Sequence, residues 1–292
     1  MAKRRFTETL HGDEAFQGFT IEQDLYIGSS PYQSIEIVQT KRFGRVLILD
    51  GIVQTTELDE FVYHEMLVHV PMFSHSSPRR VLIIGGGDGG ALREVLKHDI
   101  DQVDMIEIDE KVVSSCVEHM PSLNNAGAVY DDPRTNLIIE DAFAYLAREQ
   151  SRYDVIISDS TDPVGAGEIL FSQRFYELCE NALNADGIVA LQNGVAFLQP
   201  HESRGTMRAL RRLGLFATCY QVAVPTYYGG LMMLAYATRQ REALLPNLQQ
   251  IEARFNRCNG EFKHYNPPHH LGSFALPQWV QTITGECHDS TT

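Results

Sequence analysis

The 292-residue chain has few cysteines, one tryptophan, a deficit of positive charge and no long apolar run. Its five cysteines are scattered and include no C-x-x-C pair, which argues against a disulfide framework and a zinc ribbon and favours a reducing compartment. No stretch approaches the length of a membrane span, and the basic residues at the start precede no apolar signal core. We therefore expect a cytoplasmic protein with no membrane partner.

The charge balance is acidic, with 38 Asp and Glu against 24 Lys and Arg and a formal net charge of −14. Binding to a nucleic-acid backbone requires cationic surface, so we expect no DNA or RNA partner. An acidic protein attracts cationic small molecules through its general field. The 43% hydrophobic content suits one large globular domain or two unequal ones.

The most informative motif is the glycine-rich stretch Ile84–Gly90, which contains a carboxylate. The apolar run Val81–Ile84 predicts a buried parallel strand, and Ala91–Leu96 predicts the start of a helix. Glycines 85, 87 and 90 match G-x-G-x-x-G, a loop that usually receives a diphosphate at the helix N-terminus. Because Asp88 would repel a diphosphate, we expect a nucleoside without phosphate whose positive group lies near Asp88.

Acidic residues follow four successive predicted strands. After the Asp88 loop, Glu107 ends the next strand, at the distance from the glycines where an acid binds ribose hydroxyls. Asp141 follows the strand 136–140, and Asp159 follows 153–158. A single acid after a strand is usually a helix N-cap or a turn residue. Four acids at the carboxyl edge of an open α/β sheet instead indicate a binding site.

The element pattern divides the chain into two parts. Short alternating segments separated by turn signals predict a small antiparallel N-terminal β-domain over residues 1–60. A helix from Asp59 to Pro71 follows, and residues 61–292 form a Rossmann-like catalytic domain. Because the strands 218–224 and 231–237 form a hairpin, we expect an α/β fold: a methyltransferase-like doubly wound sheet with a late antiparallel strand.

Two histidine patterns do not predict metal sites. His64 and His69 are five residues apart, which turns them about 140° from each other on a helix, whereas a zinc helix needs a spacing of four. His269–His270 lies in a Pro-rich stretch without nearby cysteine, which favours a surface or packing role.

The segment Asp159–Pro163 fits an Asx-turn, and its two carboxylates, Asp159 and Asp162, also suit capture of an alkylammonium and removal of its proton.

These motifs, in this order, resemble the polyamine aminopropyltransferase family over nearly the full chain. The segments that carry the resemblance are Tyr32–Gln33, Leu49–Glu57, Asp59–Met66, Val81–Gly90, Asp159–Gly165, Pro225–Gly230 and Tyr265–Pro267. The resemblance implies transfer of an aminopropyl group from decarboxylated S-adenosylmethionine to putrescine, giving spermidine and methylthioadenosine. Decarboxylated S-adenosylmethionine is then a co-substrate, and no cofactor or metal is expected. The family's N-terminal β-domain usually contributes to a subunit interface, so a homodimer or homotetramer is expected.

The resemblance also assigns roles to matching positions. The donor is expected to contact Gln33, Asp88, Glu107, Asp141, Ala142 and Ala166, with Glu107 at the ribose and Asp141 at the adenine. The acceptor is expected to contact Tyr63, His64, Asp159, Asp162 and Tyr227, with Asp159 as the general base. Three positions depart from the family pattern: Leu58, Ala142 and Ala166 stand where arginine, glycine and proline are common.

The chemistry of the residues agrees with this function. The donor carries a sulfonium and an ammonium but no carboxylate, and the acceptor is a diammonium, so both suit an acid-lined pocket. The acceptor amine, with a pKa near ~10, must lose a proton before it attacks the carbon beside sulfur. The sulfonium leaves as a neutral thioether, which requires neither a metal nor an acid.

Three other functions are compatible with parts of the pattern. A methyltransferase shares the fold and Glu107, but its donor carries a carboxylate that Asp88 disfavours. A nicotinamide dehydrogenase is opposed by the same residue, which would repel the diphosphate. A non-catalytic polyamine-binding protein is disfavoured by the presence of Asp159, Asp162 and both Tyr227 and Tyr228.

Overall fold

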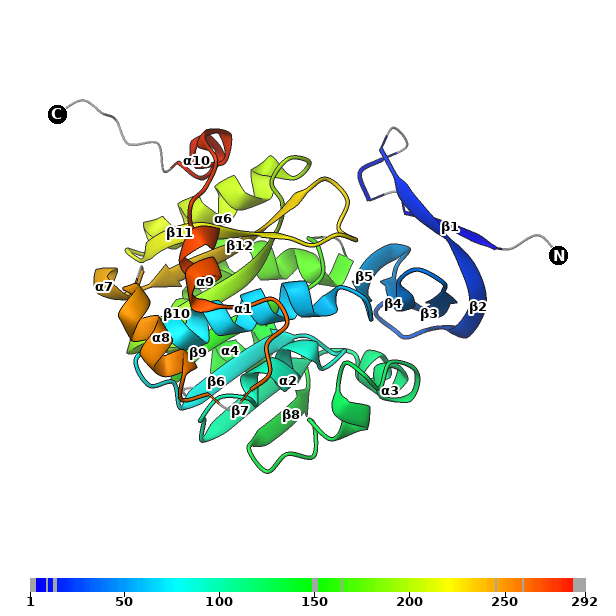
Figure 1. Ribbon diagram of the computed structural model, residues 1–292, viewed down its shortest axis with the longest axis horizontal. Coiled ribbons are helices and arrows are strands. Elements are labelled where there is room, and N and C mark those ends of the chain that lie inside the picture. The colour runs from blue at the N-terminus through cyan, green and yellow to red at the C-terminus, as the bar shows by residue number, and fades with distance from the viewer. Residues whose placement is uncertain are drawn as a thin grey trace.

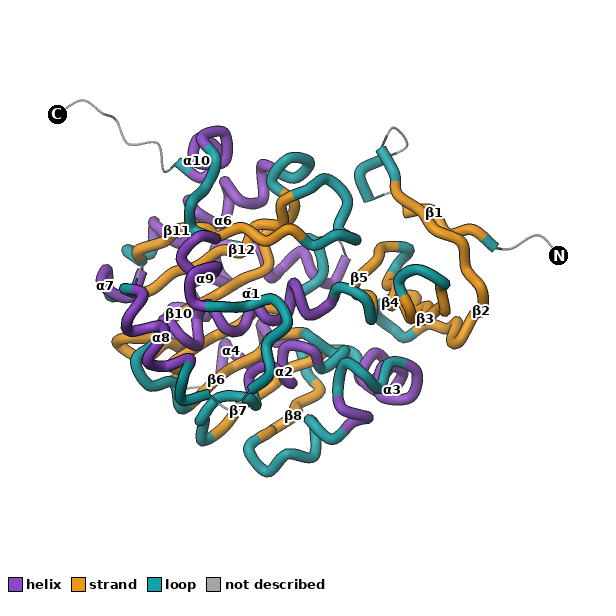
Figure 2. Tube along the Cα trace, in the orientation of Figure 1, coloured by secondary structure: helices purple, strands orange, loops and turns teal. Residues whose placement is uncertain are grey.

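The computed structural model describes residues 4–8, 10–12, 15–148, 152–163, 165–244, 246–258 and 260–285. Within these residues the strands form two separate sheets, one of five strands and one of seven. The five-stranded sheet stands beside the larger α/β part of the molecule (Figure 1). The strands of the larger sheet lie between layers of helices (Figure 2).

The smaller sheet is antiparallel throughout and follows chain order. Its strands are β1 (Arg5–Glu8), β2 (Gln17–Ser29), β3 (Ser34–Thr40), β4 (Gly44–Leu49) and β5 (Ile52–Thr56). The sequence pattern does not predict β1 or β5, which have only four and five residues. The turn before β5 is explained by Asp50 and Gly51, both with positive φ (48° and 76°), as a two-residue hairpin requires.

The larger sheet has the order β11-β12-β10-β9-β6-β7-β8. Its strands are β6 (Arg80–Gly85), β7 (Gln102–Glu107), β8 (Thr135–Ile139), β9 (Tyr153–Asp159), β10 (Leu183–Val195), β11 (Phe216–Ala223) and β12 (Leu231–Thr238). All neighbours from β8 to β10 are parallel, and β12 is antiparallel to both β10 and β11. This confirms the predicted doubly wound sheet with a late antiparallel strand.

The chain order places a topological switch point at the centre of this sheet. From β6 the chain adds β7 and β8 on one side, and it then returns to place β9 on the other side of β6. In open α/β sheets, ligands bind outside the carboxyl ends of the strands at such a point. The carboxyl ends of β6 and β9 carry the glycine loop and Asp159, and the backbone N–H of Gly86 donates to the carbonyl of Asp159 at 2.9 Å.

Helices cover both faces of the larger sheet. One face packs against α1 (Glu60–Ser74), α2 (Gly90–Val95), α8 (Leu248–Phe255) and α9 (Pro267–Ser273). The other packs against α4 (Ala142–Arg148), α5 (Gln173–Ala182), α6 (Pro200–Arg212) and α10 (Gln278–Thr284). In contrast, α3 (Glu110–His119) packs its apolar residues against β3 and β4 of the smaller sheet. Among the described residues, no helix combines the length and apolar character that crossing a bilayer requires.

Helix α1 extends beyond its predicted end. The sequence predicts a stop at Pro71, but the helix runs to Ser74 with Pro71 in its last turn. Proline there removes one backbone donor, and the burial of Met72 and Phe73 against the sheet offsets that loss. Every residue of α1 except Phe61 is buried, so this helix carries Glu60, Tyr63 and His64 into the interior.

Candidate active site

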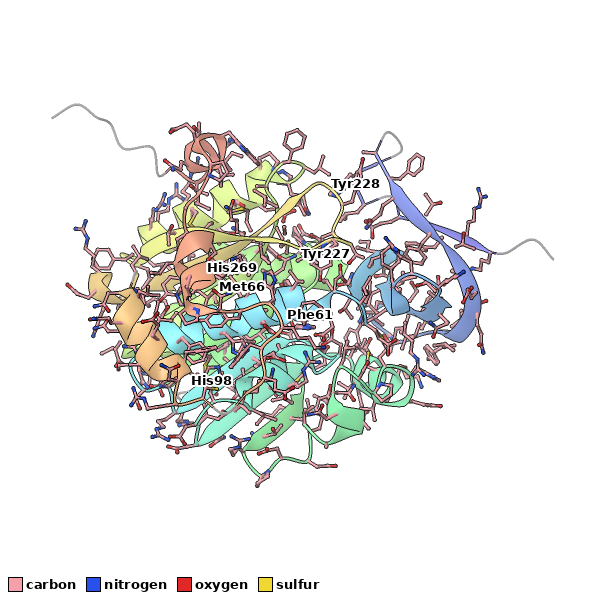
Figure 3. The ribbon with its side chains drawn as sticks, in the orientation of Figure 1. Phe61, Met66, His98, Tyr227, Tyr228 and His269 are labelled. Atoms are coloured by element: carbon pink, nitrogen blue, oxygen red, sulfur yellow. The ribbon has the colours of Figure 1, made fainter. Side chains whose placement is uncertain are left out.

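A cavity lies between the two sheets, at the carboxyl ends of β6 and β9. It is lined by residues of the smaller sheet and its turns, of α1, of the glycine loop and of the β11–β12 loop. Figure 3 shows Tyr227 and Tyr228 on that last loop, on the side of the molecule that faces the smaller sheet. The cavity is therefore closed by both parts of the chain, at the place where the switch point predicts a ligand.

The glycine loop is shaped by close packing around it. Gly85 and Gly86 have φ of 77° and 72°, and a Cβ on Gly85 would lie 2.3 Å from the carbonyl oxygen of Asp159. A Cβ on Gly87 would lie 2.9 Å from Oε2 of Glu107, and one on Gly90 would lie 2.2 Å from Cε1 of His64. The three glycines of the sequence motif therefore make room for three residues of the candidate site.

The donor side of the cavity contains Glu107 and Gln33. Oε1 of Glu107 accepts from the backbone N–H of Asp109 at 2.9 Å, and burial raises the pKa of Glu107 to about 7. Nε2 of Gln33 donates to Oδ2 of Asp109 at 2.9 Å, and Oγ of Ser30 donates to the same oxygen at 2.6 Å. Asp109 thus joins the turn after β2 to the end of β7, a role that sequence reasoning missed.

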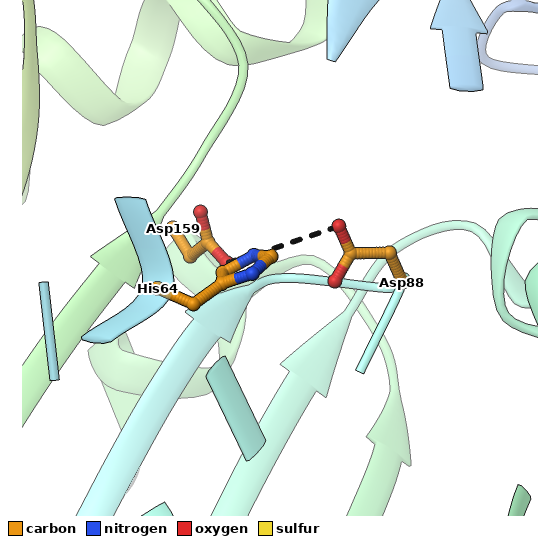
Figure 4. Close-up of side chains that lie close together, drawn as sticks. All are labelled: His64, Asp88 and Asp159. Carbon is orange, nitrogen blue, oxygen red and sulfur yellow. Dashed lines mark ion pairs between the residues drawn. The ribbon is translucent and has the colours of Figure 1, made fainter. Parts of the chain in front are cut away.

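Three residues from different elements meet at the centre of the cavity. Nε2 of His64 lies 3.6 Å from Oδ2 of Asp88 and 3.9 Å from Oδ2 of Asp159 (Figure 4). Burial lowers the pKa of His64, but the neighbouring carboxylates outweigh it and raise that pKa to about 9. Burial and Asp88 raise the pKa of Asp159 to about 6, against the opposing effects of His64 and Tyr63. His64 is therefore a cation at neutral pH, held among acids.

Two residues that the sequence analysis did not single out, Glu60 and Arg93, hold His64 on its Nδ1 side. Its Nδ1 lies 2.7 Å from Oε2 of Glu60, one helical turn earlier on α1. Nη2 of Arg93, on α2, donates to the same oxygen at 2.8 Å. The i, i+4 spacing of Glu60 and His64 on a predicted helix is a signal that could have found the first contact. No local sequence pattern predicts the contact between Arg93 and Glu60, because the two residues are 33 positions apart in the chain.

The acceptor side contains Tyr63, Tyr227 and Asp162. The hydroxyl of Tyr63 donates to Oδ1 of Asp159 at 2.8 Å, and the rings of Tyr63 and Tyr227 meet edge to face at 5.7 Å. Oδ1 of Asp162 accepts from Nε2 of Gln199 at 2.8 Å. Further along, burial and the charge of Asp162 raise the pKa of Glu202 to about 8. The cavity lining on this side thus combines the carboxyl groups of Asp159 and Asp162 with the aromatic rings of Tyr63 and Tyr227.

The structure brings most of the predicted site residues together. The cavity is lined by Gln33, Tyr63, His64, Asp88, Glu107, Asp159, Asp162 and Tyr227. Asp141 and Ala142 are not among its lining residues, because Asp141 lies at the start of α4, where Oδ1 accepts from the backbone N–H groups of Phe143 and Ala144. Ala166 belongs to the 3-10 turn η2 (Gly165–Phe171), and its side chain lies outside the described part of the chain.

The central cluster has a geometry that could hold a cation. The ligating atoms of His64, Asp88 and Asp159 all lie within 4.8 Å of one another. The two carboxylates of this cluster also suit an organic ammonium or sulfonium, which needs no lone pair from the imidazole. The same spacing occurs at His75, Asp154 and Asp186, away from the cavity. There Nδ1 of His75 accepts from the backbone N–H of Ser77 at 3.2 Å, which leaves the proton on the nitrogen that faces Asp186.

Two family models match the chain. Residues 60–246 match the spermine/spermidine synthase domain, and residues 6–57 match the spermidine synthase tetramerisation domain. Among curated proteins, polyamine aminopropyltransferase 1 of Pseudomonas aeruginosa is 47% identical over 284 residues, which cover 96% of this chain and 98% of that protein. A polyamine aminopropyltransferase of Klebsiella pneumoniae is 47% identical over 274 residues, covering 94% and 95%.

Solved structures agree in fold over nearly the whole chain. A spermidine synthase in complex with the transition-state analogue AdoDATO superimposes with a TM-score of 0.91 and 34% identity, covering 98% of this chain and 97% of the other. Spermidine synthase from Thermotoga maritima superimposes with a TM-score of 0.88 and 33% identity, covering 97% and 96%.

Proposed function

Since the chain belongs to the spermine/spermidine synthase family and is a polyamine aminopropyltransferase, we propose that it acts on decarboxylated S-adenosylmethionine and putrescine, with Asp159 as the general base. The products are spermidine and methylthioadenosine. The observation that carries this proposal is the cluster of Tyr63, Asp88 and Asp159 around the switch point of the sheet. It offers two carboxylates and a phenol to two cationic substrates.

Asp159 fits the role of a base that accepts a proton from an ammonium. Its pKa of about 6 makes it a stronger base than an ordinary aspartate, and it is still ionised at neutral pH. The amine transfers one proton to Asp159, and its freed lone pair attacks the carbon beside the sulfonium from the side opposite sulfur. The C–S bond breaks, and its electron pair leaves with the neutral thioether. Placement of the two substrates in line supplies much of the rate.

Asp88 and Glu107 support binding of the donor. Asp88 lies in the loop where an ordinary methyltransferase donor would present its carboxylate, so like charges disfavour intact S-adenosylmethionine. Glu107 lies at the end of β7, where an acid binds ribose hydroxyls, and Gln33 closes the same side. We keep Asp141, Ala142 and Ala166 as proposed donor-binding residues, with Asp141 at the adenine, which requires the ligand to reach beyond the residues that line the cavity.

The acceptor's two charged ends suit a cavity lined by two carboxylates, Asp159 and Asp162, and by the rings of Tyr63 and Tyr227. Asp159 and Tyr227 hold the attacking amine, and polar groups around His64 and Asp162 bind the distal ammonium. The methylenes then lie against Tyr63. Since the N-terminal residues match a tetramerisation domain, we propose that the enzyme works as a homo-oligomer in the cytoplasm, without a cofactor or metal.

The test is release of methylthioadenosine by the purified enzyme, measured by chromatography. Release that requires both decarboxylated S-adenosylmethionine and putrescine supports the proposal, with spermidine formed in equal amount. Intact S-adenosylmethionine with the same acceptor is the matched control, because it differs only by the carboxylate. Turnover of the intact donor with methyl transfer, or release that does not depend on a diamine, would overturn the proposal.

A further inference from the structure

The imidazole of His64 is held at both nitrogens in a nearly fully buried position, with 1% of its surface exposed. Nδ1 contacts Glu60 on its own helix at 2.7 Å, and Nε2 faces Asp88 of the glycine loop and Asp159 of β9. A Cβ on Gly90 would overlap the ring, which shows how closely the start of α2 packs against it. The ring therefore has little room to turn, and its environment changes only if the neighbouring charges change.

The other ionisable groups around His64 do not neutralise Asp88 and Asp159. Arg93 of α2 shares the oxygen of Glu60 that faces His64, so the charge of Glu60 is already balanced. The phenols of Tyr63 on α1 and Tyr227 on the β11–β12 loop are neutral, because burial raises both pKa values well above 10. Among the residues that the structure describes, the cation nearest to Asp88 and Asp159 in the free enzyme is thus the Nε2–H group of His64.

We propose that His64 is a replaceable counter-ion: it is a cation in the free enzyme, and it loses its Nε2 proton to solvent when the cationic donor binds. This inference rests on the proposed function, since it places the donor's sulfonium and ammonium beside Asp88 and Asp159. Those two groups would take over the carboxylates that stabilise the imidazolium, and they would repel its positive charge. The electrostatic attraction of Asp88 and Asp159 that keeps His64 protonated is then offset by the positive charges of the donor.

The hydrogen bonds determine which proton leaves. The Nδ1–H group donates to Glu60, which stays ionised because Arg93 also binds it, so this bond survives in both states. The Nε2 proton instead faces the carboxylates of Asp88 and Asp159, at 3.6 and 3.9 Å. After it leaves, Nε2 presents a lone pair to the cavity and can accept an N–H of the bound ammonium. His64 is a positioning residue in this scheme, because it takes no proton from the reacting amine.

Calorimetric titration of the full-length enzyme tests the inference. Decarboxylated S-adenosylmethionine is titrated at pH 8.0 in two buffers of different ionisation enthalpy, and the difference in heat gives the number of protons released. We expect roughly one proton per donor bound, because a group with a pKa of about 9 is mostly protonated at that pH. Methylthioadenosine is the matched ligand: it occupies the nucleoside site without sulfonium or ammonium, and we expect it to release almost none.

Two further measurements identify the group. His64→Gln is expected to bind the donor with roughly one fewer proton released than the unmodified enzyme. Nitrogen-15 NMR of labelled histidines in the unmodified enzyme is expected to show one imidazolium becoming neutral at Nε2 with the donor but not with methylthioadenosine. Equal proton release by both ligands, or an unchanged release in His64→Gln, would overturn the inference. If the donor produces no binding heat while methylthioadenosine binds, the proposed function fails instead.

Discussion

The hydroxyl of Tyr63 donates a 2.8 Å hydrogen bond to Oδ1 of Asp159, joining helix α1 to the end of strand β9. Because burial raises the pKa of this phenol well above 10, it is neutral and remains a hydrogen-bond donor at neutral pH. The bond holds one oxygen of the carboxylate, while the second oxygen faces His64 at 3.9 Å. Asp159 is therefore oriented before any substrate binds, as an effective base requires.

Replacing Asp159 by asparagine keeps the shape of the side chain and removes its basicity. We expect Asp159→Asn to lower kcat by roughly 10²–10⁴-fold, the usual range for a positioned general base, with a much smaller loss of donor affinity because Asp88 still faces the donor's cationic groups. Tyr63→Phe, which removes only the orienting bond, should lower kcat by a smaller factor. Methylthioadenosine release measures turnover, and calorimetry measures donor binding. Near-normal turnover of Asp159→Asn would exclude this residue as the base.

Substitutions of His64 and Asp88, two neighbours of Asp159, should shift the acid limb of the pH profile of kcat/KM in opposite directions. The base must be deprotonated, so kcat/KM for the donor, which reports the free enzyme, falls as the pH decreases through the pKa of Asp159, about 6. His64 lowers that pKa by its positive charge and Asp88 raises it by its negative charge. His64→Gln should therefore move the limb to higher pH, and Asp88→Asn should move it to lower pH. Shifts in the same direction in both variants would contradict the assignment of this limb to Asp159.

Asp88 should also act as the sensor of the donor's carboxylate. Loss of a charged hydrogen bond costs roughly 1.5–3 kcal/mol, so Asp88→Asn should weaken the decarboxylated donor by about that amount. Intact S-adenosylmethionine should lose less, because the variant no longer repels its carboxylate, and discrimination between the two nucleosides should narrow. Calorimetric titration of both ligands measures this. If discrimination is unchanged, another group excludes the carboxylate.

Much of the fold and part of the site could be predicted from local sequence. The strands β6 to β9 are apolar runs that end in turn or acidic residues, and the parallel arrangement brings their ends together, which gathers Asp88, Glu107 and Asp159. Helix α1 was predicted only as far as Pro71, because local propensity does not include the burial that stabilises its last turn.

Contacts between distant segments could not be predicted. Arg93 balances Glu60 only because α1 packs on α2, and Gln33 reaches Asp109 only because the turn after β2 docks on the end of β7. Asp141 shows that a local sequence signature can also be ambiguous. An acid after a strand has the same sequence signature whether it lines a cavity or caps a helix, and here the structure shows it capping α4.

Gly90 offers a steric test of the His64 environment. Its φ is not in the left-handed region, so alanine is compatible with the backbone, but the new Cβ would lie 2.2 Å from Cε1 of His64. Overpacking costs roughly 1–3 kcal/mol, so Gly90→Ala should lower the free energy of unfolding by about that amount and reduce kcat/KM. Gly205→Ala on α6 is the control, since nothing lies within 4 Å of its Cβ. It should be neutral or stabilising by up to about 1 kcal/mol. Denaturant titration compares the two, and equal stability would show that the ring moves freely.

The acceptor should be putrescine in preference to cadaverine, which has one more methylene. The carboxylates of Asp159 and Asp162 line the same cavity as the aromatic contact between Tyr63 and Tyr227, and both are held by hydrogen bonds, from Tyr63 and Gln199 respectively. Two fixed acidic groups set a span for the diamine, so the longer chain of cadaverine must buckle or displace its distal ammonium from its partners.

A single methylene is worth about 1–3 kcal/mol of binding free energy, which predicts a preference for putrescine of roughly 10–200-fold in kcat/KM rather than complete exclusion of cadaverine. Competition of the two diamines in one reaction, with separation of the products, measures the ratio. Equal or greater transfer to cadaverine, or to spermidine, would show that a longer acceptor fits this cavity and that Asp162 does not define its far end.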